Sequence, residues 1–322
     1  MLKKSNVDIF RKQGNILGVK ITGTPKDDLL IQIEKYLVKI SQKRAYLGSS
    51  RPLFITTPNP EQVVLSKKDP LFKKILKYSD ISLCDGIGLL TAHEYFLRKI
   101  RNKTYLSNPN YLSNFSYFLF SLFSVLKKGS ASDGLKIIKG RDFFIVLLEV
   151  ANKKRYKVFL LGTEKIYLKK AVSVLSKRYP AVQFQYEHDL YLDKNGVPVN
   201  NNLTIKQFDD EIKNRFDARA ESKIIRKINS FNPDMLFVAF GAPKQEKWVY
   251  RSLNRLNTGF VMVVGGTFDY IAGKQKLPNK LIERIGLEWL WRLLTGSQRI
   301  DRVFNAVVKF PWIIIKSSCT NK

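Results

Sequence analysis

The sequence predicts a doubly wound α/β domain, in which helices cover both faces of a parallel β-sheet. Short apolar runs recur along the chain, and each ends at a glycine or another turn residue. Charged segments with helical spacing lie between several of these runs. With 322 residues, 44% of them hydrophobic, the chain is also long enough to bury a large core.

Six apolar runs are the expected strands. They are continuous rather than alternating, which is typical of parallel strands that are buried on both faces. In chain order they read NILGVKITG, PLFITTPN, ISLCDG, YKVFLLGT, DMLFVAFGAP and FVMVVGGTFD. The covering helices are expected in segments such as EQVVLSKKDPLFKKILKYS and KIYLKKAVSVLSKRYP.

Two stretches interrupt this alternation, near residues 97–139 and 191–224, and we expect both to be insertions. Residues 104–126 carry no charge and many aromatic, Ser and Asn residues. They fit either a membrane-contacting segment or a packed aromatic hairpin. Residues 275–322 interleave tryptophans with aliphatic and basic residues, which fits an interfacial amphipathic segment or a core-facing helix pair. The predicted domains are therefore 1–274 and a C-terminal appendage, 275–322.

The net charge of +29 indicates partners that carry phosphate, whether nucleic acid, anionic lipid or nucleotide. The basic residues are spread along the chain without a nucleic-acid-binding motif, so we expect no nucleic-acid partner. Two cysteines and two histidines are too few for a zinc site or a disulfide framework. No long apolar run follows the N-terminal basic residues, so we expect no secretory signal and a protein that stays inside the cell.

Polar residues where the predicted strands end are the candidate site, because open α/β sheets bind ligands there. Asp85 closes the run ISLCDG. An aspartate before a glycine is usually a turn residue, but a carboxylate at this place also suits a general base. Gly86 and Gly88 resemble a dinucleotide fingerprint that lacks its third glycine, so a nicotinamide-dependent oxidoreductase stays an alternative. Thr57 and Asn59 follow the strand PLFIT and suit either sugar hydroxyls or a helix cap.

Further along the chain, glycine-containing loops are candidates for binding a nucleotide. After DMLFVAF, a helix is expected to begin near Pro243, and its free N–H groups with a neighbouring lysine suit a phosphate. Glycines in the other loops let a ligand approach the backbone. The candidates are Gly162, Gly241, Lys244, Gln245, Gly265, Gly266, Thr267 and Asp269.

Three tail arginines, Arg292, Arg299 and Arg302, are spaced by seven and three residues. On an unbroken helix they would lie within about 80° of one another, although Gly296 and Ser297 favour a break. Arginine suits bidentate contact with diphosphate oxygens, but a basic tail that faces solvent or lipid is the more common arrangement.

Taken in order, TPN, CDGIG, KGRD, FLLGT, NPDMLFVAFGAPKQEKW, GGTFDYIAGKQKLP and GLEWLWRLLTGSQRIDR resemble the TagA/WecG/CpsF glycosyltransferases, glycosyltransferase family 26. The resemblance covers most of the chain outside the insertions. It implies a Rossmann-like catalytic domain with a C-terminal helical appendage that associates with the membrane and closes over the active site. The implied reaction is inverting transfer of a hexose, such as N-acetylmannosamine, from a UDP-sugar to a polyprenyl-diphosphate-linked sugar in surface polysaccharide or teichoic acid synthesis.

The resemblance also implies residue roles. Asp85 would be the catalytic base, Thr57, Asn59 and Gln245 would bind substrate, and the three tail arginines would bind the departing UDP. It implies no metal and no cofactor, and we expect no metal at Glu187-His188-Asp189. The implied location is the cytoplasm, peripheral at the inner face of an anionic membrane. The oligomeric state is not predicted, and a non-catalytic basic membrane or nucleic-acid-binding protein remains the further alternative.

Two departures from the family pattern concern the tail. Gly296 and Ser297 stand where the family usually has an acidic residue and a proline, and KLP replaces an Arg-Ala-Pro-like triplet. We therefore expect the appendage of this chain to fold differently in detail.

Overall fold

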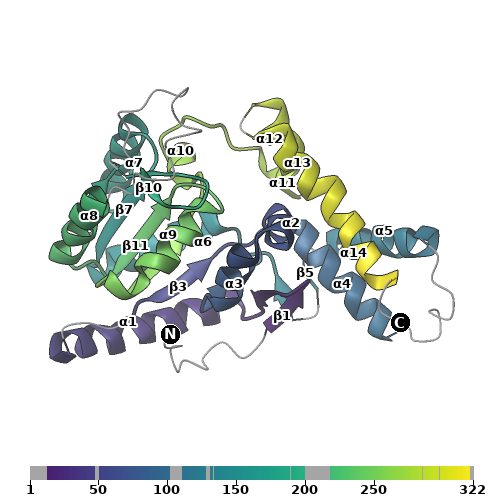
Figure 1. The fold of residues 1–322 in the computed structure, drawn as a ribbon, viewed down its shortest axis with the longest axis horizontal. Coiled ribbons are helices and arrows are strands. Elements are labelled where there is room, and N and C mark those ends of the chain that lie inside the picture. Colours follow the sequence, from purple (N-terminus) through teal and green to yellow (C-terminus); the bar gives the residue numbers. More distant parts are fainter. Residues whose placement is uncertain are drawn as a thin grey trace. The chain divides into compact units, whose positions relative to one another are not determined.

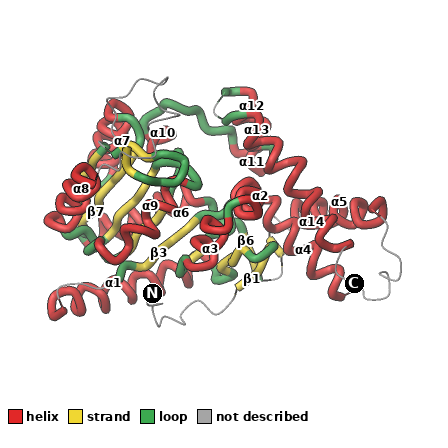
Figure 2. The backbone as a smooth tube through the Cα atoms, viewed as in Figure 1, coloured by secondary structure: helices red, strands yellow, loops and turns green. Residues whose placement is uncertain are grey.

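The computed structural model describes residues 13–47, 51–101, 111–127, 131–132, 134–188, 190–199, 218–284, 286–296 and 298–319. Its largest sheet has six strands, surrounded by helices (Figures 1 and 2). In sheet order the strands are β4 (Ile81–Ser82), β3 (Leu53–Thr56), β12 (Phe260–Val263), β11 (Met235–Ala239), β7 (Lys157–Gly162) and β8 (Gln183–Glu187). The four neighbouring pairs from β3 to β8 are parallel. The predicted α/β fold with a parallel sheet is confirmed.

The chain divides into two compact units, which we describe separately. Unit 1 contains Leu30–Thr56 and Arg141–Gln275. Unit 2 contains Val7–Leu29, Thr57–Gly140 and Lys276–Lys322. The C-terminal tail thus belongs to the same unit as residues 57–140, whereas the boundary at residue 274 remains a prediction.

Unit 1 is built around the sheet. Every residue of β3, β11 and β12 is buried, because apolar runs without alternation need cover on both faces. Phe237 of β11 forms edge contacts with Phe144 and Phe260, with ring centroids 4.6 and 5.7 Å apart. The edge strand β8 carries the polar sequence QFQYE, and for this reason apolar runs did not predict it. The helices of unit 1 are α1 (Lys26–Leu47, continuing from unit 2), α6 (Gly140–Lys154), α7 (Lys165–Arg178), α8 (Ala218–Phe231), α9 (Lys244–Ser252), the 3₁₀ turn η4 (Leu253–Arg255) and α10 (Thr267–Ile271).

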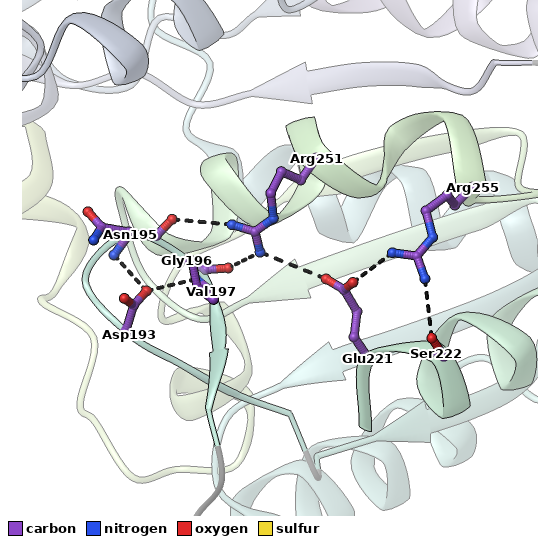
Figure 3. A network of polar contacts seen from close by, with 8 residues as sticks. All are labelled: Asp193, Asn195, Gly196, Val197, Glu221, Ser222, Arg251 and Arg255. Carbon is purple, nitrogen blue, oxygen red and sulfur yellow. Dashed lines mark hydrogen bonds and ion pairs between the residues drawn. The ribbon is translucent and has the colours of Figure 1, made fainter. Parts of the chain in front are cut away.

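The second predicted insertion begins with a small antiparallel hairpin, β9 (Tyr191–Leu192) and β10 (Pro198–Val199). A network of polar contacts fastens its turn to neighbouring helices (Figure 3). The guanidinium of Arg251 donates to the carbonyl of Gly196, and the buried carboxylate of Glu221 lies 2.6 Å from Arg255 and 3.8 Å from Arg251. A Cβ on Gly196 would lie 2.6 Å from the Lys244 carbonyl, so the turn needs glycine to pack against α9. Residues 200–217 of this insertion lie outside the described part of the chain.

In unit 2, the first apolar run does not form the parallel strand that its sequence predicted. It folds back on itself as the antiparallel hairpin β1 (Gln13–Ile16) and β2 (Val19–Thr22). Leu17 and Gly18 both adopt positive φ, 54° and 88°, and the Gly18 N–H donates to the Asn15 side chain. This two-residue turn has the conformation that joins adjacent antiparallel strands, and it explains why the prediction was wrong.

The remaining described elements of unit 2 are mostly helices. The segment EQVVLSKKDPLFKKILKYS, which was expected to be helical, contains two helices, since Asp69 caps the second helix with a 2.9 Å bond to the Phe72 N–H and Pro70 begins it. In the tail, α11 and α12 are short helices, whereas α13, η5 and α14 follow one another without a loop (Figure 2). The elements are α2 (Pro60–Lys68), α3 (Pro70–Tyr78), α4 (Ile87–Arg101), α5 (Tyr111–Lys127), β5 (Ala131–Ser132), β6 (Leu135–Lys136), α11 (Lys280–Arg284), α12 (Glu288–Leu294), α13 (Ile300–Phe304), the π-helical turn η5 (Asn305–Lys309) and α14 (Phe310–Cys319).

The uncharged segment of the first insertion is largely helical. Residues 111–127 form the helix α5 instead of the aromatic hairpin that was one of the two interpretations. Residues 102–110 lie outside the described residues. Across the described ranges, every helix is too short or too polar to cross a bilayer.

Candidate functional site

Asp85 of unit 2 is fixed by the backbone on both sides. Its N–H donates to the Pro58 carbonyl over 3.2 Å, and the carbonyl of the preceding Cys84 accepts from the Ile138 N–H over 2.9 Å. Strand β4 ends three residues before Asp85, so Asp85 lies in a short loop. This loop is hydrogen bonded to the loops that contain Pro58 and Ile138. The site is thus assembled from residues 57–60, 84–88 and 138–140.

Gly140 and Thr57 form the immediate surroundings of the Asp85 carboxylate. The Gly140 N–H hydrogen bonds to the carboxylate. A Cβ on Gly140 would lie 2.7 Å from the Thr57 side chain, so glycine allows this close approach. Thr57 and Asp85 therefore both lie beside Gly140.

The electrostatic surroundings of Asp85 favour its protonated form. Burial raises the pKa of Asp85 to about 6, and the Glu288 carboxylate adds to the increase. The Arg292 guanidinium, the Gly140 N–H and Lys139 act in the opposite direction. Asp85 itself remains partly exposed. A carboxylate with a pKa near neutrality that solvent can still reach is suited to accept and release a proton.

Lys139 ties the tail to the Asp85 loop. Its ammonium lies 2.9 Å from a Glu288 oxygen and 3.2 Å from a Glu283 oxygen. Burial disfavours the charged ammonium, but the two carboxylates outweigh this effect and raise the pKa of Lys139. Glu288 opens α12 and Glu283 lies in α11, so one lysine holds two tail helices beside the general-base candidate.

The three tail arginines do not share one helix. Helix α12 ends at Leu294, and the chain turns at Gly296, whose φ is 64°, before α13 begins at Ile300. The break favoured by Gly296 is therefore present, and Ser297 lies outside the described residues. The arrangement on an unbroken helix does not occur.

Each of these arginines has a different environment. Arg292 lies near Asp85, and its Nε is buried without a hydrogen-bond partner. Arg302 donates to the buried Glu61 over 2.6 Å. Arg299 has a side chain that is 79% exposed, and it forms an ion pair with Asp301 over 2.6 Å. Of the three arginines, Arg292 is the one that the structure brings to Asp85.

Asn59 and the two glycines after Asp85 have local structural roles. The Asn59 side chain accepts from the Gln62 N–H over 2.9 Å and caps α2, which was the alternative to sugar binding. Gly86 has a φ of 120°, and a Cβ on Gly88 would lie 2.7 Å from Pro60. The glycines thus allow a turn and close helix packing, so their presence does not require a dinucleotide.

In unit 1, Gln245 links two of the predicted nucleotide loops. It is buried, and its Oε1 accepts from the N–H groups of Gly241 and Gly265 over 3.2 and 3.3 Å. Its Nε2 donates to Glu246 over 3.0 Å. Gly241 and Gly265 both have positive φ and open space around the position of a Cβ. Gln245 therefore sets the distance between two exposed backbone turns.

The other candidates in unit 1 also bind protein groups. Lys244 donates to the Leu192 carbonyl over 3.0 Å, and Thr267 donates to the Val264 carbonyl over 2.6 Å. Asp269 accepts from Thr163 over 2.6 Å. A Cβ on Gly162 would lie 2.6 Å from the Ala239 carbonyl, so this glycine allows β7 and β11 to pack closely. Gly266 caps α10.

The run predicted to hold no metal contains an ion pair. Glu187 pairs with Lys227 over 2.7 Å, and the His188 ring lies 3.4 Å from Glu187. Asp189 lies outside the described residues. A search of the described ranges finds no group of three His, Cys, Asp or Glu side chains placed to hold a metal ion.

Sequence reasoning assigned no role to three charged residues of unit 2, namely Lys139, Glu288 and Glu61. All three lie in or beside recognised motifs, KGRD, GLEW and TPNPE. Their roles depend on contacts between segments more than a hundred residues apart, which spacing along the chain does not reveal. The one available signal was that these three charged residues, one basic and two acidic, lie in motifs that also contain or adjoin site residues.

Comparison with known proteins gives an independent result. The model of the glycosyl transferase WecG/TagA/CpsF family matches residues 15–109 and 130–322. The chain is 27% identical over 280 residues to N-acetylglucosaminyldiphosphoundecaprenol N-acetyl-beta-D-mannosaminyltransferase of Bacillus subtilis (strain 168), which covers 87% of this chain and 86% of that protein. It is 23% identical over 289 residues to the protein of the same name from Staphylococcus aureus (strain NCTC 8325), covering 90% and 87%. Because the family model covers most of its length, this chain belongs to the glycosyl transferase WecG/TagA/CpsF family.

Proposed function

We propose that this glycosyltransferase moves an N-acetylmannosamine-like hexose from a UDP-sugar to N-acetylglucosamine linked to a polyprenyl diphosphate, with inversion at the anomeric carbon. The similar proteins of Bacillus subtilis and Staphylococcus aureus carry names that specify this acceptor and this sugar. The observation that carries the proposal is the Asp85 carboxylate, partly exposed, with a pKa of about 6 and with Arg292 and Lys139 close by.

Asp85 is the proposed general base. The acceptor hydroxyl attacks the anomeric carbon, its proton passes to the Asp85 carboxylate, and the bond from the anomeric carbon to the UDP oxygen breaks. A single displacement of this kind inverts the configuration and needs one base. A positioned base of this type contributes on the order of 10²–10⁴ in rate.

Arg292 is the proposed partner of the developing negative charge. Its Nε is buried and lacks a hydrogen-bond acceptor, and a buried donor left in this state is unfavourable until an anion binds. Lys139 is already held by two carboxylates, so it is suited to position the tail. Thr57 lies beside Gly140 and is the candidate for contact with a sugar hydroxyl.

The glycine turns of unit 1 are the proposed nucleotide-binding elements. Gly241 and Gly265 leave room at the backbone, and Gln245 holds the two turns at a fixed spacing. Each loop follows the carboxyl end of a parallel strand, the usual position of a ligand in an open α/β sheet. In this proposal Gln245 acts by shaping the turns.

The lipid-linked acceptor and the net charge of +29 lead us to propose a peripheral location at the cytoplasmic, anionic face of the cell membrane. The chain needs no cofactor and no metal in this mechanism, since arginine and lysine supply the positive charge. Charged side chains can stabilise a diphosphate leaving group in this way.

The test is transfer by the purified chain with UDP-N-acetylmannosamine and a short-chain polyprenyl-diphosphate N-acetylglucosamine. We expect a β-linked disaccharide product, and kcat/KM that rises with pH through about 6 as Asp85 ionises. Asp85→Asn should lower kcat by about 10² or more. Asp142→Asn is the matched control, because its carboxylate is exposed and pairs with the neighbouring Arg141.

Two results would contradict the proposal. One is transfer by Asp85→Asn at the rate of the unchanged chain, which would remove the base. The other is the absence of any transfer from UDP-sugars together with binding of a nicotinamide cofactor, which would support the oxidoreductase alternative.

A further inference from the structure

Helix α5 is an element that this chain has in addition to the family pattern. The family model matches up to residue 109 and resumes at residue 130, and α5 covers Tyr111–Lys127 between these limits. The roles that the family implies for its C-terminal tail therefore do not explain α5.

Helix α5 exposes apolar side chains that an ordinary surface helix would bury. Leu112, Phe115, Leu119 and Phe123 are 75, 47, 47 and 65% exposed. At 100° per residue these four side chains lie within about 80° of one another, and we call them the α5 face. The other side of the helix buries Asn114, Phe118, Ser121 and Val125, so two polar side chains are buried while four large apolar ones are exposed. A helix on the surface of a soluble protein normally exposes its polar residues instead.

Polar contacts hold α5 in this orientation. The Tyr95 hydroxyl donates to Asn114 Oδ1 over 3.0 Å, and Asn114 Nδ2 donates to the sulfur of Cys319 over 3.2 Å. Arg98 donates to Ser124 over 2.9 Å. These bonds join α5 to α4 and α14, so turning the apolar side chains inward would break all of them. The exposed position of the α5 face is thus built into the packing of unit 2.

The α5 face continues onto the tail. The rings of Tyr111 and Trp312 are stacked, with centroids 5.6 Å apart and an interplanar angle of 9°. Figure 1 shows α5 beside α14, and the contacts between the two helices agree. Phe304, Val308 and Trp312, four residues apart on the tail helices, are all more than half exposed. Aromatic and aliphatic side chains from both segments therefore share one side of unit 2.

The charges around this surface are positive. The sequences of α5, η5 and α14 contain Lys127, Lys309 and Lys316 and no acidic residue. The neighbouring Lys68 lowers the pKa of Lys309, so two basic side chains lie together at the edge of the tail. Such a pair is favourable when an anion lies between or above the two groups.

We propose that the α5 face is a second membrane-docking surface of this chain, which inserts its aromatic and aliphatic side chains among the headgroups of an anionic bilayer. Phenylalanine and leucine side chains gain from contact with acyl chains, tryptophan suits the headgroup level, and the lysines bind lipid phosphates. The docking proposal depends on the proposed function in one respect, because a lipid-linked acceptor brings the enzyme to the membrane. It assigns membrane contact to the inserted helix α5 as well as to the tail.

The test compares the full chain with the variant Phe115→Ser/Leu119→Ser/Phe123→Ser in sedimentation with vesicles. The vesicles contain equal parts of phosphatidylglycerol and phosphatidylcholine, or phosphatidylcholine alone. The matched control is Ile31→Ser/Val38→Ser/Ile166→Ser, which removes three apolar side chains that are also exposed, from α1 and α7. Circular dichroism and thermal unfolding show whether both variants fold as the unchanged chain does.

We expect the α5 variant to bind the anionic vesicles more than about tenfold more weakly, with the control variant unchanged. Transfer to a short-chain, water-soluble acceptor should be the same for all three proteins. Equal vesicle binding by the α5 variant would overturn the proposal. So would an oligomer in sedimentation velocity that is lost only in the α5 variant, because the face would then bind a second copy of the chain.

These readouts separate this proposal from the proposed function. If no protein transfers sugar to the soluble acceptor, the proposed function fails, while the vesicle measurements still decide the role of α5. If transfer occurs and the α5 variant keeps full vesicle binding, only the docking proposal fails.

Discussion

Gln245, in the first turn of α9 in unit 1, and Asp85, in a loop of unit 2, both follow strands of the largest sheet, and both accept hydrogen bonds from backbone N–H groups. Their surroundings differ. Gln245 is buried, and its amide binds Gly241, Gly265 and Glu246. Asp85 is partly exposed, with Glu288 raising its pKa and Arg292 nearby without a hydrogen-bond partner at Nε.

In the proposed function this difference separates Gln245, which shapes a site, from Asp85, which reacts in one. A neutral amide whose groups are bonded within the protein lowers the free energy of the fold. A carboxylate with a raised pKa and a buried guanidinium Nε without an acceptor each raise the free energy of the fold, and such groups are found where substrates bind. Substitutions in the two regions should therefore change stability in opposite directions, and the following predictions test this.

The largest effect is expected for the tail arginines. Arg292→Met should lower kcat/KM by about 10²–10³, because it removes a guanidinium whose charge acts at Asp85 from the stabilisation of the leaving group. The matched control is Arg299→Met, which should lose less than about threefold, since Arg299 is exposed and pairs with Asp301. Steady-state transfer rates check both. Equal losses would show that Arg299 reaches the substrate, as the family resemblance implies, and would contradict the distinction made here.

The next effect concerns the stability of the fold. Burial and Glu288 raise the pKa of Asp85 from 3.8 to about 6, so ionising this group opposes folding as pH increases between these values. Asp85→Asn should therefore stabilise the protein at pH 7.5, by up to about 3 kcal/mol. The difference should shrink below pH 6 and disappear below about pH 4, where both folded and unfolded chains carry a neutral Asp85. Urea unfolding at several pH values measures this, and a destabilised variant at pH 7.5 would contradict it.

Gln245 should behave in the opposite way. Gln245→Leu removes the acceptor shared by the Gly241 and Gly265 N–H groups, and we expect a loss of about 1–3 kcal/mol at any pH between 5 and 8. Gln183→Leu, at an exposed position of the edge strand β8, is the control and should change stability by less than about 0.5 kcal/mol. If Gln245→Leu unfolds like the unchanged chain while activity is lost, Gln245 contacts substrate directly.

The sequence predicted the parts of this fold that depend on local patterns. Continuous apolar runs indicated β3, β7, β11 and β12, because buried parallel strands need apolar side chains on both faces. The same pattern failed at the first run, where the positive φ of Leu17 and Gly18 turns the chain into a hairpin. The edge strand β8 was missed because one exposed edge allows polar residues.

Prediction of the site followed the same limits. Motifs indicated Asp85 and Thr57, and the structure places both beside Gly140. The pairing of Lys139 with Glu288, and of Glu61 with Arg302, joins segments that are distant in the chain, so the fold is needed to see it. The sequence showed that α5 has an unusual composition. It did not show that the apolar side chains face outward, because this orientation depends on the hydrogen bonds of Asn114.

The smallest effect is expected at Lys139, and it tests how the tail tunes Asp85. Lys139→Met removes a cation that lowers the pKa of Asp85, and it leaves the Glu288 carboxylate without the partner that offsets its charge. Both changes favour the protonated form of Asp85. The midpoint of the rise in kcat/KM with pH should therefore move upward by about half a unit, with the rate at high pH nearly unchanged. Lys136→Met, an exposed neighbour on β6, should leave the midpoint in place. An unchanged midpoint for Lys139→Met would mean that Lys139 and the tail carboxylates do not act on Asp85, and the contrast between the two regions would then rest on Arg292 alone.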